Sequence, residues 1–261
     1  MTSPFADRFD FADGGVSRPV FHSGVGPAVL LLHELPGMTP EFWRLGRRIA
    51  DAGFAVFAPD LYGRAGAREP TRPSLAGGLV RACISRHIHL LATDRASPIT
   101  DWLRALAQRA SEMSERPNVG VVGLCMTGNF AWTLALEPII QAPVAAAPSL
   151  PLGVTQRARA GLHMSAADRE RAAVDETPLL AFRFEGDPAC GAARFAALRG
   201  VFGDRLEAHV LPDLAQNKET GNPFPHALLT KDLVDEEGAP THDALKRVLA
   251  FLEARLRPAR S

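Results

Sequence analysis

The stretch Val119-Gly120-Val121-Val122-Gly123-Leu124-Cys125-Met126-Thr127-Gly128 passes from an apolar run into a run of small residues. A short, continuous apolar run predicts a strand that is buried on both faces. The small and apolar residues from Thr127 to Leu136 predict a helix directly after it. Cys125 is therefore expected in a tight turn between a strand and a helix.

The same alternation of strands and helices extends to both sides of this turn. We expect further strands at 9–11, 16–21, 28–33, 54–58, 178–184 and 206–211, an apolar run of the same kind at 143–147, and helices at 40–52, 98–113, 166–176, 192–202 and 243–256. This order predicts an α/β fold with one mostly parallel sheet and helices on both of its faces.

The segments between these elements indicate the domain organisation. No repeat, low-complexity tract or long Pro/Gly/Ser linker divides the chain, so residues 1–261 are expected to form a single domain. The segment around 64–97 is rich in Gly, Pro and Arg, and its centre at 79–91 is compatible with a short helix. We expect this segment to cover a pocket as a lid.

The charge and the apolar runs limit the classes of partner. The chain has 261 residues with 29 Lys and Arg against 29 Asp and Glu, so it lacks the basic excess of a nucleic-acid-binding protein. Its longest apolar runs, such as residues 28–32, are too short to cross a bilayer. We therefore expect neither a nucleic acid nor a membrane as a partner.

The cysteines and the N-terminal residues indicate a reducing compartment. Cys83, Cys125 and Cys190 are odd in number, far apart and without a C-x-x-C pair, which is a poor pattern for disulfides and for a zinc site. Residues 1–15 carry acidic side chains early and no apolar core of signal-peptide length. The expectation is a cytoplasmic protein without a metal.

Cys125 stands where an α/β-hydrolase carries its nucleophile, in a G-x-nucleophile-x-small pattern. Bulky neighbours would collide with the adjoining strand and helix in so tight a turn. A helix that begins there directs free N–H groups and its positive end at the sulfur, which favours the thiolate. The backbone N–H of Met126 is then one expected donor to an oxyanion. The alternative is that Cys125 is a small buried hydrophobic residue, as we interpret Cys83 and Cys190.

Two later residues are expected to complete a catalytic triad with Cys125. Nucleophile, acid and histidine follow one another in this order in α/β-hydrolases. Asp187 follows the strand at 178–184, and His226 lies in a loop after the next strand. Asp187 falls at the carboxyl end of its strand, where the sites of open α/β sheets lie. Both positions are those that the fold assigns to the orienting acid and the base. A turn aspartate and a surface histidine are the structural alternatives.

Three motifs together resemble the dienelactone hydrolase family, a branch of the α/β-hydrolases with a cysteine nucleophile. They are His33-Glu34-Leu35-Pro36-Gly37, Ala58-Pro59-Asp60-Leu61-Tyr62-Gly63-Arg64 and Gly123-Leu124-Cys125. The resemblance extends from about Val20 to the last helix. It implies hydrolysis of an ester or lactone by a Cys-His-Asp triad, without a metal or a cofactor.

The resemblance also implies roles for the motif after the first buried strand. The family's glutamate that matches Glu34 holds the resting thiol, which stays largely neutral until substrate displaces the carboxylate. A carboxylate near a thiol disfavours the thiolate and can accept its S–H, so this role is physically reasonable. The backbone N–H of Leu35 would be the second oxyanion donor. We interpret His33 as a structural histidine of the loop.

The sequence departs from the family pattern at two places. Thr127 stands where the family usually has glycine, and a β-branched side chain there is expected to reshape the turn. The residues after His226 lack the serine and the arginine with which strict dienelactone hydrolases hold the substrate carboxylate. Arg81 and Arg86 in the lid segment are the candidates for an anion contact.

The resulting hypothesis is a hydrolase that cleaves a small ester or lactone, present as a monomer or a homodimer. Three alternatives stay open. The same triad is compatible with a thioesterase or acyl-transfer activity, the chain can be a catalytically silent binding protein, and Cys125 can be a redox-sensing thiol.

Overall fold

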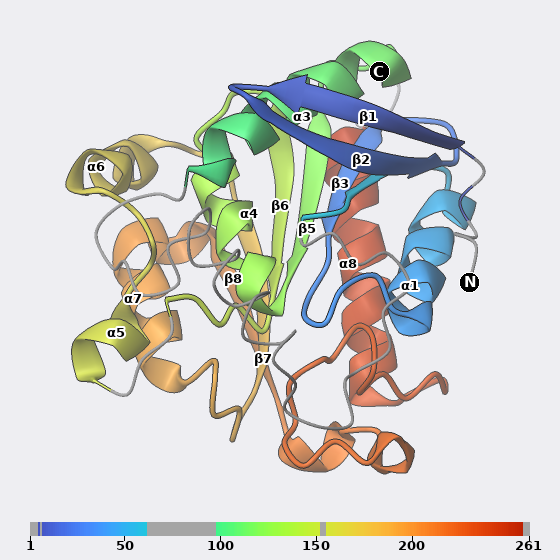
Figure 1. The fold of residues 1–261 in the computed structure, drawn as a ribbon. Helices are drawn as coiled ribbons and strands as arrows, with labels where there is room; N and C mark the ends of the chain where they lie inside the picture. The colour runs from blue at the N-terminus through green and yellow to red at the C-terminus, as the bar shows by residue number, and fades with distance from the viewer. Residues whose placement is uncertain (1–4, 6, 62–97, 152–154, 258–261) are drawn as a thin grey trace.

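The computed structural model describes residues 5, 7–61, 98–151 and 155–257 (Figure 1). Within these residues one sheet of eight strands forms the centre of the molecule. The strands are β1 (Asp7–Asp13), β2 (Val16–Ser23), β3 (Ala28–Leu32), β4 (Ala55–Pro59), β5 (Val119–Leu124), β6 (Ile140–Ala146), β7 (Leu179–Phe184) and β8 (Leu206–Leu211). Their order in the sheet is β1-β2-β4-β3-β5-β6-β7-β8. β1 and β2 are antiparallel to their neighbours, and the other pairs are parallel, which confirms the predicted mostly parallel sheet.

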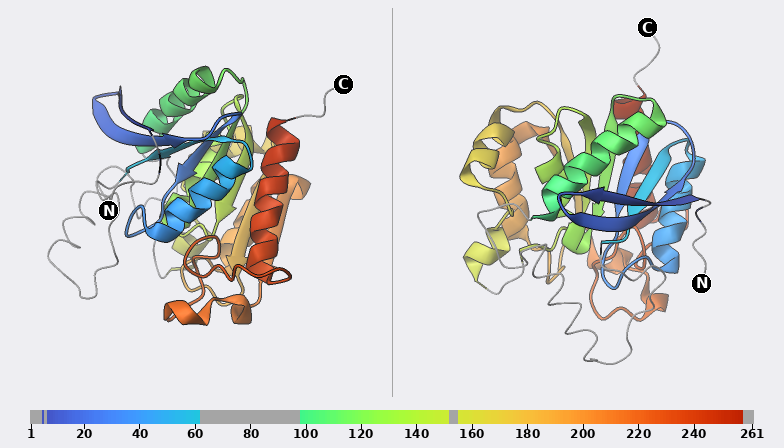
Figure 2. Two further views of the ribbon diagram at one scale, coloured as in Figure 1. Left: turned by 90° about the vertical axis from the view of Figure 1, so that its right-hand side faces the viewer. Right: turned by 45° about the horizontal axis from the view of Figure 1, so that its top comes forward.

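Helices cover both faces of this sheet, as Figures 1 and 2 show. They are α1 (Pro40–Asp51), α3 (Ile99–Ser114), α4 (Asn129–Leu134), α5 (Gln156–Ala160), α6 (Ala166–Val174), α7 (Ala192–Phe202) and α8 (Pro240–Leu256). Apolar residues of α1 and α8 share one core cluster with one face of the central strands. Residues of α3, α4 and α7 pack on the opposite face. Burial of an apolar stripe on each helix therefore fixes the three layers.

Local signals in the sequence account for the starts of several helices. The Thr39 hydroxyl accepts a hydrogen bond from the Phe42 N–H at 3.3 Å and caps α1. Ser165 caps α6 in a capping box. The last helix begins at Pro240, three residues before the predicted start, because proline fits the first turn of a helix.

One predicted helix needs correction, and one observed helix was not predicted. The helix expected at 127–136 is shorter: a 3₁₀ turn spans Cys125–Thr127, and α4 ends at Leu134. Pro138 follows closely, and a proline disfavours the helical backbone conformation at the residue before it. The five-residue helix α5 was not predicted, because so short an element has no periodicity to detect.

Several predictions fall outside the described residues. The lid segment around 64–97, the helix at 79–91, Cys83, Arg81 and Arg86 lie there in whole. The single domain over residues 1–261 stays a prediction. In the described ranges no helix has the length and apolar character needed to span a membrane.

Candidate active site

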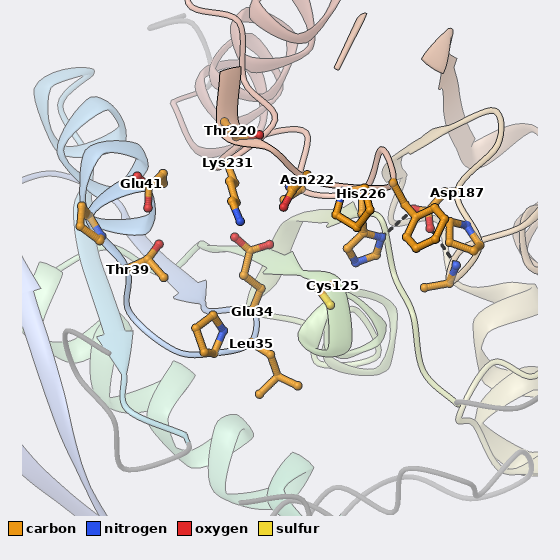
Figure 3. Close-up of a pocket in the computed structure, with 17 residues that line it drawn as sticks. Glu34, Leu35, Thr39, Glu41, Cys125, Asp187, Thr220, Asn222, His226 and Lys231 are labelled. Carbon is orange, nitrogen blue, oxygen red and sulfur yellow. Dashed lines mark hydrogen bonds and ion pairs between the residues drawn. The ribbon is translucent and has the colours of Figure 1, made fainter. Parts of the chain in front are cut away.

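The carboxyl ends of β3, β5, β6 and β7 meet at one edge of the sheet, and a cavity of about 640 Å³ opens there. Its lining contains Glu34 and Leu35 after β3, Cys125 after β5, Asp187 after β7 and His226 from the loop before α8. Figure 3 shows these side chains around one space. Parallel strands place their carboxyl ends side by side, so residues from four distant segments meet here.

Cys125 lies in the tight turn that the sequence predicts. Its φ of 52° is in the left-handed region, which a non-glycine residue adopts only at a cost. A Cβ on Gly123 would lie 2.5 Å from the Thr127 carbonyl oxygen, and one on Gly128 would lie 2.8 Å from the Cα of Pro148. Both glycines are therefore required by close backbone contacts.

Thr127 anchors this turn rather than distorting it. Its hydroxyl accepts a hydrogen bond from the Leu124 N–H at 3.0 Å and lies 2.9 Å from the carbonyl oxygens of Leu32 and Leu124. The side chain is fully buried. The hydroxyl therefore links the turn to the end of β3, and the close approach that a glycine permits is made one residue later, at Gly128.

The structure brings Asp187 and His226 together, as predicted. Nδ1 of His226 lies 2.7 Å from Oδ2 of Asp187, whose side chain is fully buried (Figure 3). The other oxygen, Oδ1, accepts hydrogen bonds from the N–H groups of Ala189 and Cys190 at 2.8 and 3.0 Å. A carboxylate only accepts, so Nδ1 carries the proton and Nε2 is free to act as a base.

His226 and Cys125 line the same cavity. Burial lowers the pKa of the imidazole, but charge and hydrogen-bond interactions with Cys125 and Asp187 outweigh it and raise this pKa well above its usual value. The protonated imidazole is therefore stabilised between a sulfur and a carboxylate. Such an arrangement suits a side chain that takes a proton from a thiol.

A buried carboxylate that the sequence analysis missed holds the loop of His226. Oδ2 of Asp232 accepts hydrogen bonds from the N–H groups of His226 and Ala227 at 2.9 and 2.8 Å. Its Oδ1 accepts from the side-chain amides of Gln216 and Asn222. Asp232 has no exposed surface. No periodicity or motif marks it, because its role depends on how the loop folds back on itself.

Ser149 is a second residue that the sequence analysis missed. Its hydroxyl oxygen lies 3.4 Å from Sγ of Cys125, and its N–H donates to the Cys125 carbonyl oxygen at 3.0 Å. It follows β6 at the carboxyl edge of the sheet. The expectation that site residues follow the carboxyl ends of strands, which predicted Asp187, applies equally to Ser149.

Glu34 lies in the cavity, but its carboxylate has a different partner from the one expected. We expected it to hold the thiol of Cys125. Instead Oε1 of Glu34 is hydrogen-bonded to the hydroxyl of Thr230, and Figure 3 shows the carboxylate directed toward Lys231. The thiol has Ser149 as its hydrogen-bonding neighbour. A contact between segments 196 residues apart decides this orientation, and no local pattern encodes it.

The protonation of Glu34 is expected to make stability pH-dependent. Burial raises its pKa from 4.5 to about 7, although Thr230 and His226 act in the opposite direction. Below about pH 4.5 the Glu34 carboxyl is protonated in both the folded and the unfolded chain, and its contribution to the free energy of unfolding is fully present. As the pH rises toward 7 the unfolded chain releases the proton first, so the free energy of unfolding falls by about 3 kcal/mol.

A Glu34→Gln variant is expected to lack the part of the pH dependence of stability that comes from Glu34. Relative to the original chain, its free energy of unfolding should increase between pH 5 and pH 8, since glutamine carries no charge to bury. Urea unfolding at pH 5, 6, 7 and 8 measures the difference. Glu41→Gln, at a more exposed carboxylate of the same cavity, is the control. Equal pH dependence of the Glu34→Gln variant and the original chain would contradict the expectation.

The two expected oxyanion donors are the backbone N–H groups of Leu35, after β3, and of Met126, after Cys125. Among the hydrogen bonds between described residues, none is donated by the backbone N–H of Leu35 or of Met126. Leu35 lines the cavity, and Met126 directly follows the cysteine. Neither N–H group therefore has a hydrogen-bond acceptor among the described residues.

Other titratable residues of the chain have structural partners in the fold. Nδ1 of His33 lies 3.0 Å from the Glu34 carbonyl oxygen, and its Nε2 accepts from the Leu61 N–H at 3.0 Å, so this buried ring joins the loops after β3 and β4. The ring of His209 stacks on Phe182. Asp213 accepts from the Gly186 N–H at 2.7 Å and thereby supports the turn that carries Asp187. Cys190 is buried, and burial raises its thiol pKa.

The chain is similar to several known proteins. The model of the dienelactone hydrolase family matches residues 16–211, which include Glu34, Cys125 and Asp187 and end before His226. An epoxide hydrolase of Caballeronia sordidicola is 37% identical over 68 residues, which cover 26% of this chain and 21% of that relative. A carboxymethylenebutenolidase of Rhodococcus opacus is 30% identical over 118 residues, which cover 44% of this chain and 41% of the relative. The matches thus span less than half the length of these two curated relatives.

A solved structure supports the fold over almost the whole chain. A crystal structure assigned to the dienelactone hydrolases, from Klebsiella pneumoniae, has a TM-score of 0.65 at 19% identity and covers 94% of this chain and 96% of its own. Likeness at this identity establishes the fold, and the family match extends over well over half of the residues. The chain has the α/β-hydrolase fold and belongs to the dienelactone hydrolase family.

Proposed function

We propose that this protein hydrolyses a small carboxylic ester or lactone through a triad of Cys125, His226 and Asp187. The observation that carries the proposal is the 2.7 Å hydrogen bond between Nδ1 of His226 and Asp187, in the lining of the same cavity as Cys125. The family membership and the name of the Rhodococcus relative support a lactone or ester as the substrate class. A cavity of about 640 Å³ is within the range that binds small molecules.

In the first half of the reaction the thiol becomes acylated. Nε2 of His226 takes the proton of Cys125, and Sγ attacks the carbonyl carbon to form a tetrahedral oxyanion. The N–H groups of Leu35 and Met126 donate to this oxyanion. When the intermediate collapses, the bond to the leaving oxygen breaks and Nε2–H returns the proton to that oxygen. In a lactone the ring opens, and the alcohol stays attached to the acyl group.

In the second half a water molecule releases the acid. Nε2 of His226 takes a proton from the water, whose oxygen attacks the thioester carbonyl. Collapse of the second tetrahedral intermediate breaks the C–S bond and expels the thiolate of Cys125, which takes back the proton from Nε2–H of His226. Asp187 keeps the proton on Nδ1 throughout and stabilises the imidazolium that forms.

Trapping of the acyl-enzyme tests the proposal. Mixing the protein with p-nitrophenyl acetate is expected to release p-nitrophenolate, and acid quenching followed by peptide mass spectrometry should place one acetyl group on Cys125. The Cys190→Ala variant, which removes a buried thiol outside the triad, is the control and should be acetylated equally. Absence of turnover over a panel of esters and lactones, together with absence of acetylation at Cys125, would contradict the proposal.

A further inference from the structure

We propose that the hydroxyl of Ser149 donates a hydrogen bond to the thiolate of Cys125 and thereby stabilises the charged form of the nucleophile. This inference rests on the proposed function, because it concerns the same cysteine. It adds a contact to the reacting atom from a fourth segment of the chain, the loop after β6. Ser149 forms no part of the triad.

Both the side chain and the main chain of Ser149 contact Cys125. Oγ of Ser149 lies 3.4 Å from Sγ, within hydrogen-bonding distance for sulfur, and the serine N–H donates to the carbonyl oxygen of the same cysteine. Ser149 is only 2% exposed, so water does not compete freely for its hydroxyl. Because main chain and side chain both face Cys125, the hydroxyl has little freedom to turn elsewhere.

A buried arginine fixes the loop on which Ser149 lies. The guanidinium of Arg194 donates to the carbonyl oxygens of Pro148 and Leu150 at 3.0 and 2.6 Å, and also to that of Pro151 at 2.9 Å. Arg194 is itself 2% exposed. It therefore holds the residues on both sides of Ser149 with charge-assisted hydrogen bonds. The hydroxyl is preorganised before a substrate arrives.

The direction of the hydrogen bond follows from charge. A hydroxyl can accept from a neutral S–H or donate to a thiolate, but a hydrogen bond to an ionised partner is roughly twice as strong as one between neutral groups. The contact therefore stabilises the thiolate more than the thiol. The ionisable groups around Cys125 are His226 with Asp187 behind it, Glu34, Glu41 and Lys231 of the cavity, and the buried thiol of Cys190. The imidazolium of His226 acts in the same direction as Ser149.

The pH dependence of thiol alkylation tests this inference without requiring turnover. The rate at which iodoacetamide modifies Cys125 follows the thiolate fraction, and peptide mass spectrometry separates Cys125 from the other cysteines. In Ser149→Ala we expect the midpoint of this profile to move up by about one pH unit. Ser149→Thr, which retains a hydroxyl, should restore the original midpoint. Ser111→Ala, the same deletion in α3 away from the cavity, should leave it unchanged.

Turnover provides a second readout with a distinct signature. Ester hydrolysis by Ser149→Ala should fall up to about tenfold at pH values below the thiol midpoint and recover above it, with KM unchanged. If Ser149→Ala does not fold, Ser149→Gly removes the same hydroxyl and is expected to give the same shift. A midpoint that stays in place or moves down in these variants would overturn the inference. If the midpoint shifts as expected but the original protein cleaves no ester, the inference stands and the proposed function fails.

Discussion

The Cys125→Ala variant is expected to lose ester hydrolysis by a factor of about 10⁴–10⁶ in kcat. In the proposed mechanism alanine removes the sulfur that forms the acyl-enzyme, so the reaction is left with water as the nucleophile. The backbone of the turn, with its φ of 52° at this residue, is retained because alanine has the same Cβ. Steady-state kinetics with p-nitrophenyl acetate measure the loss.

A serine at the same position separates the role of the sulfur from that of the site. Cys125→Ser keeps a nucleophilic atom beside His226 but replaces a thiol by a far weaker acid. We expect its kcat to lie between those of the original protein and of Cys125→Ala. Thermal unfolding of both variants should match the original chain to within a few degrees. Undiminished ester hydrolysis by Cys125→Ala would contradict the proposed mechanism.

The Asp187→Asn variant is expected to lose about 10³–10⁴-fold in kcat, although its shape is nearly unchanged. The structure predicts how the amide must lie. The N–H groups of Ala189 and Cys190 donate to Oδ1, so the amide oxygen takes that place and the NH₂ group faces His226. An NH₂ group only donates, so Nδ1 becomes the acceptor and the proton moves to Nε2. The nitrogen that should take the proton of Cys125 then already carries one.

The same variant should also change the pH dependence. Asp187 raises the pKa of His226, so its neutralisation lowers that pKa and moves the acidic limb of kcat/KM to lower pH. Asp213→Asn is the matched control, because Asp213 accepts an N–H bond in the same turn through one oxygen and does not contact His226. Full activity of Asp187→Asn, or an equal loss in Asp213→Asn, would contradict the assigned role of Asp187.

The strands and the helices of the fold were predictable to within a few residues, because hydrophobic periodicity is a local property. The strands at 119–124 and 206–211 and the helix at 192–202 agree with β5, β8 and α7. The helix after Cys125 was predicted too long, since its small residues are compatible with both helix and turn and a proline beyond Leu136 ends it. Local patterns therefore define where elements lie better than where they end.

The candidate site was predictable only in part. The sequence places Cys125 and Asp187 directly after strands and His226 in the loop before the last helix. The carboxyl ends of parallel strands lie side by side, so residues at these positions come together. The partner of Glu34 was predicted wrongly, since a carboxylate in a crowded cavity takes whichever donor the fold places nearest. Here that donor comes from the loop of His226, near the other end of the chain.

By itself the sequence determined the layered α/β fold, the tight turn at Cys125 and the order of cysteine, aspartate and histidine. These features follow from apolar periodicity, turn glycines and position after a strand. Each is a property of neighbouring residues, so it can be recognised without the tertiary structure. Only the tertiary structure decided that Ser149 faces the sulfur, that Asp232 holds the histidine loop and that Glu34 bonds to Thr230. Each of these is a hydrogen bond whose geometry depends on how separate segments pack, and packing is specified by the whole core at once.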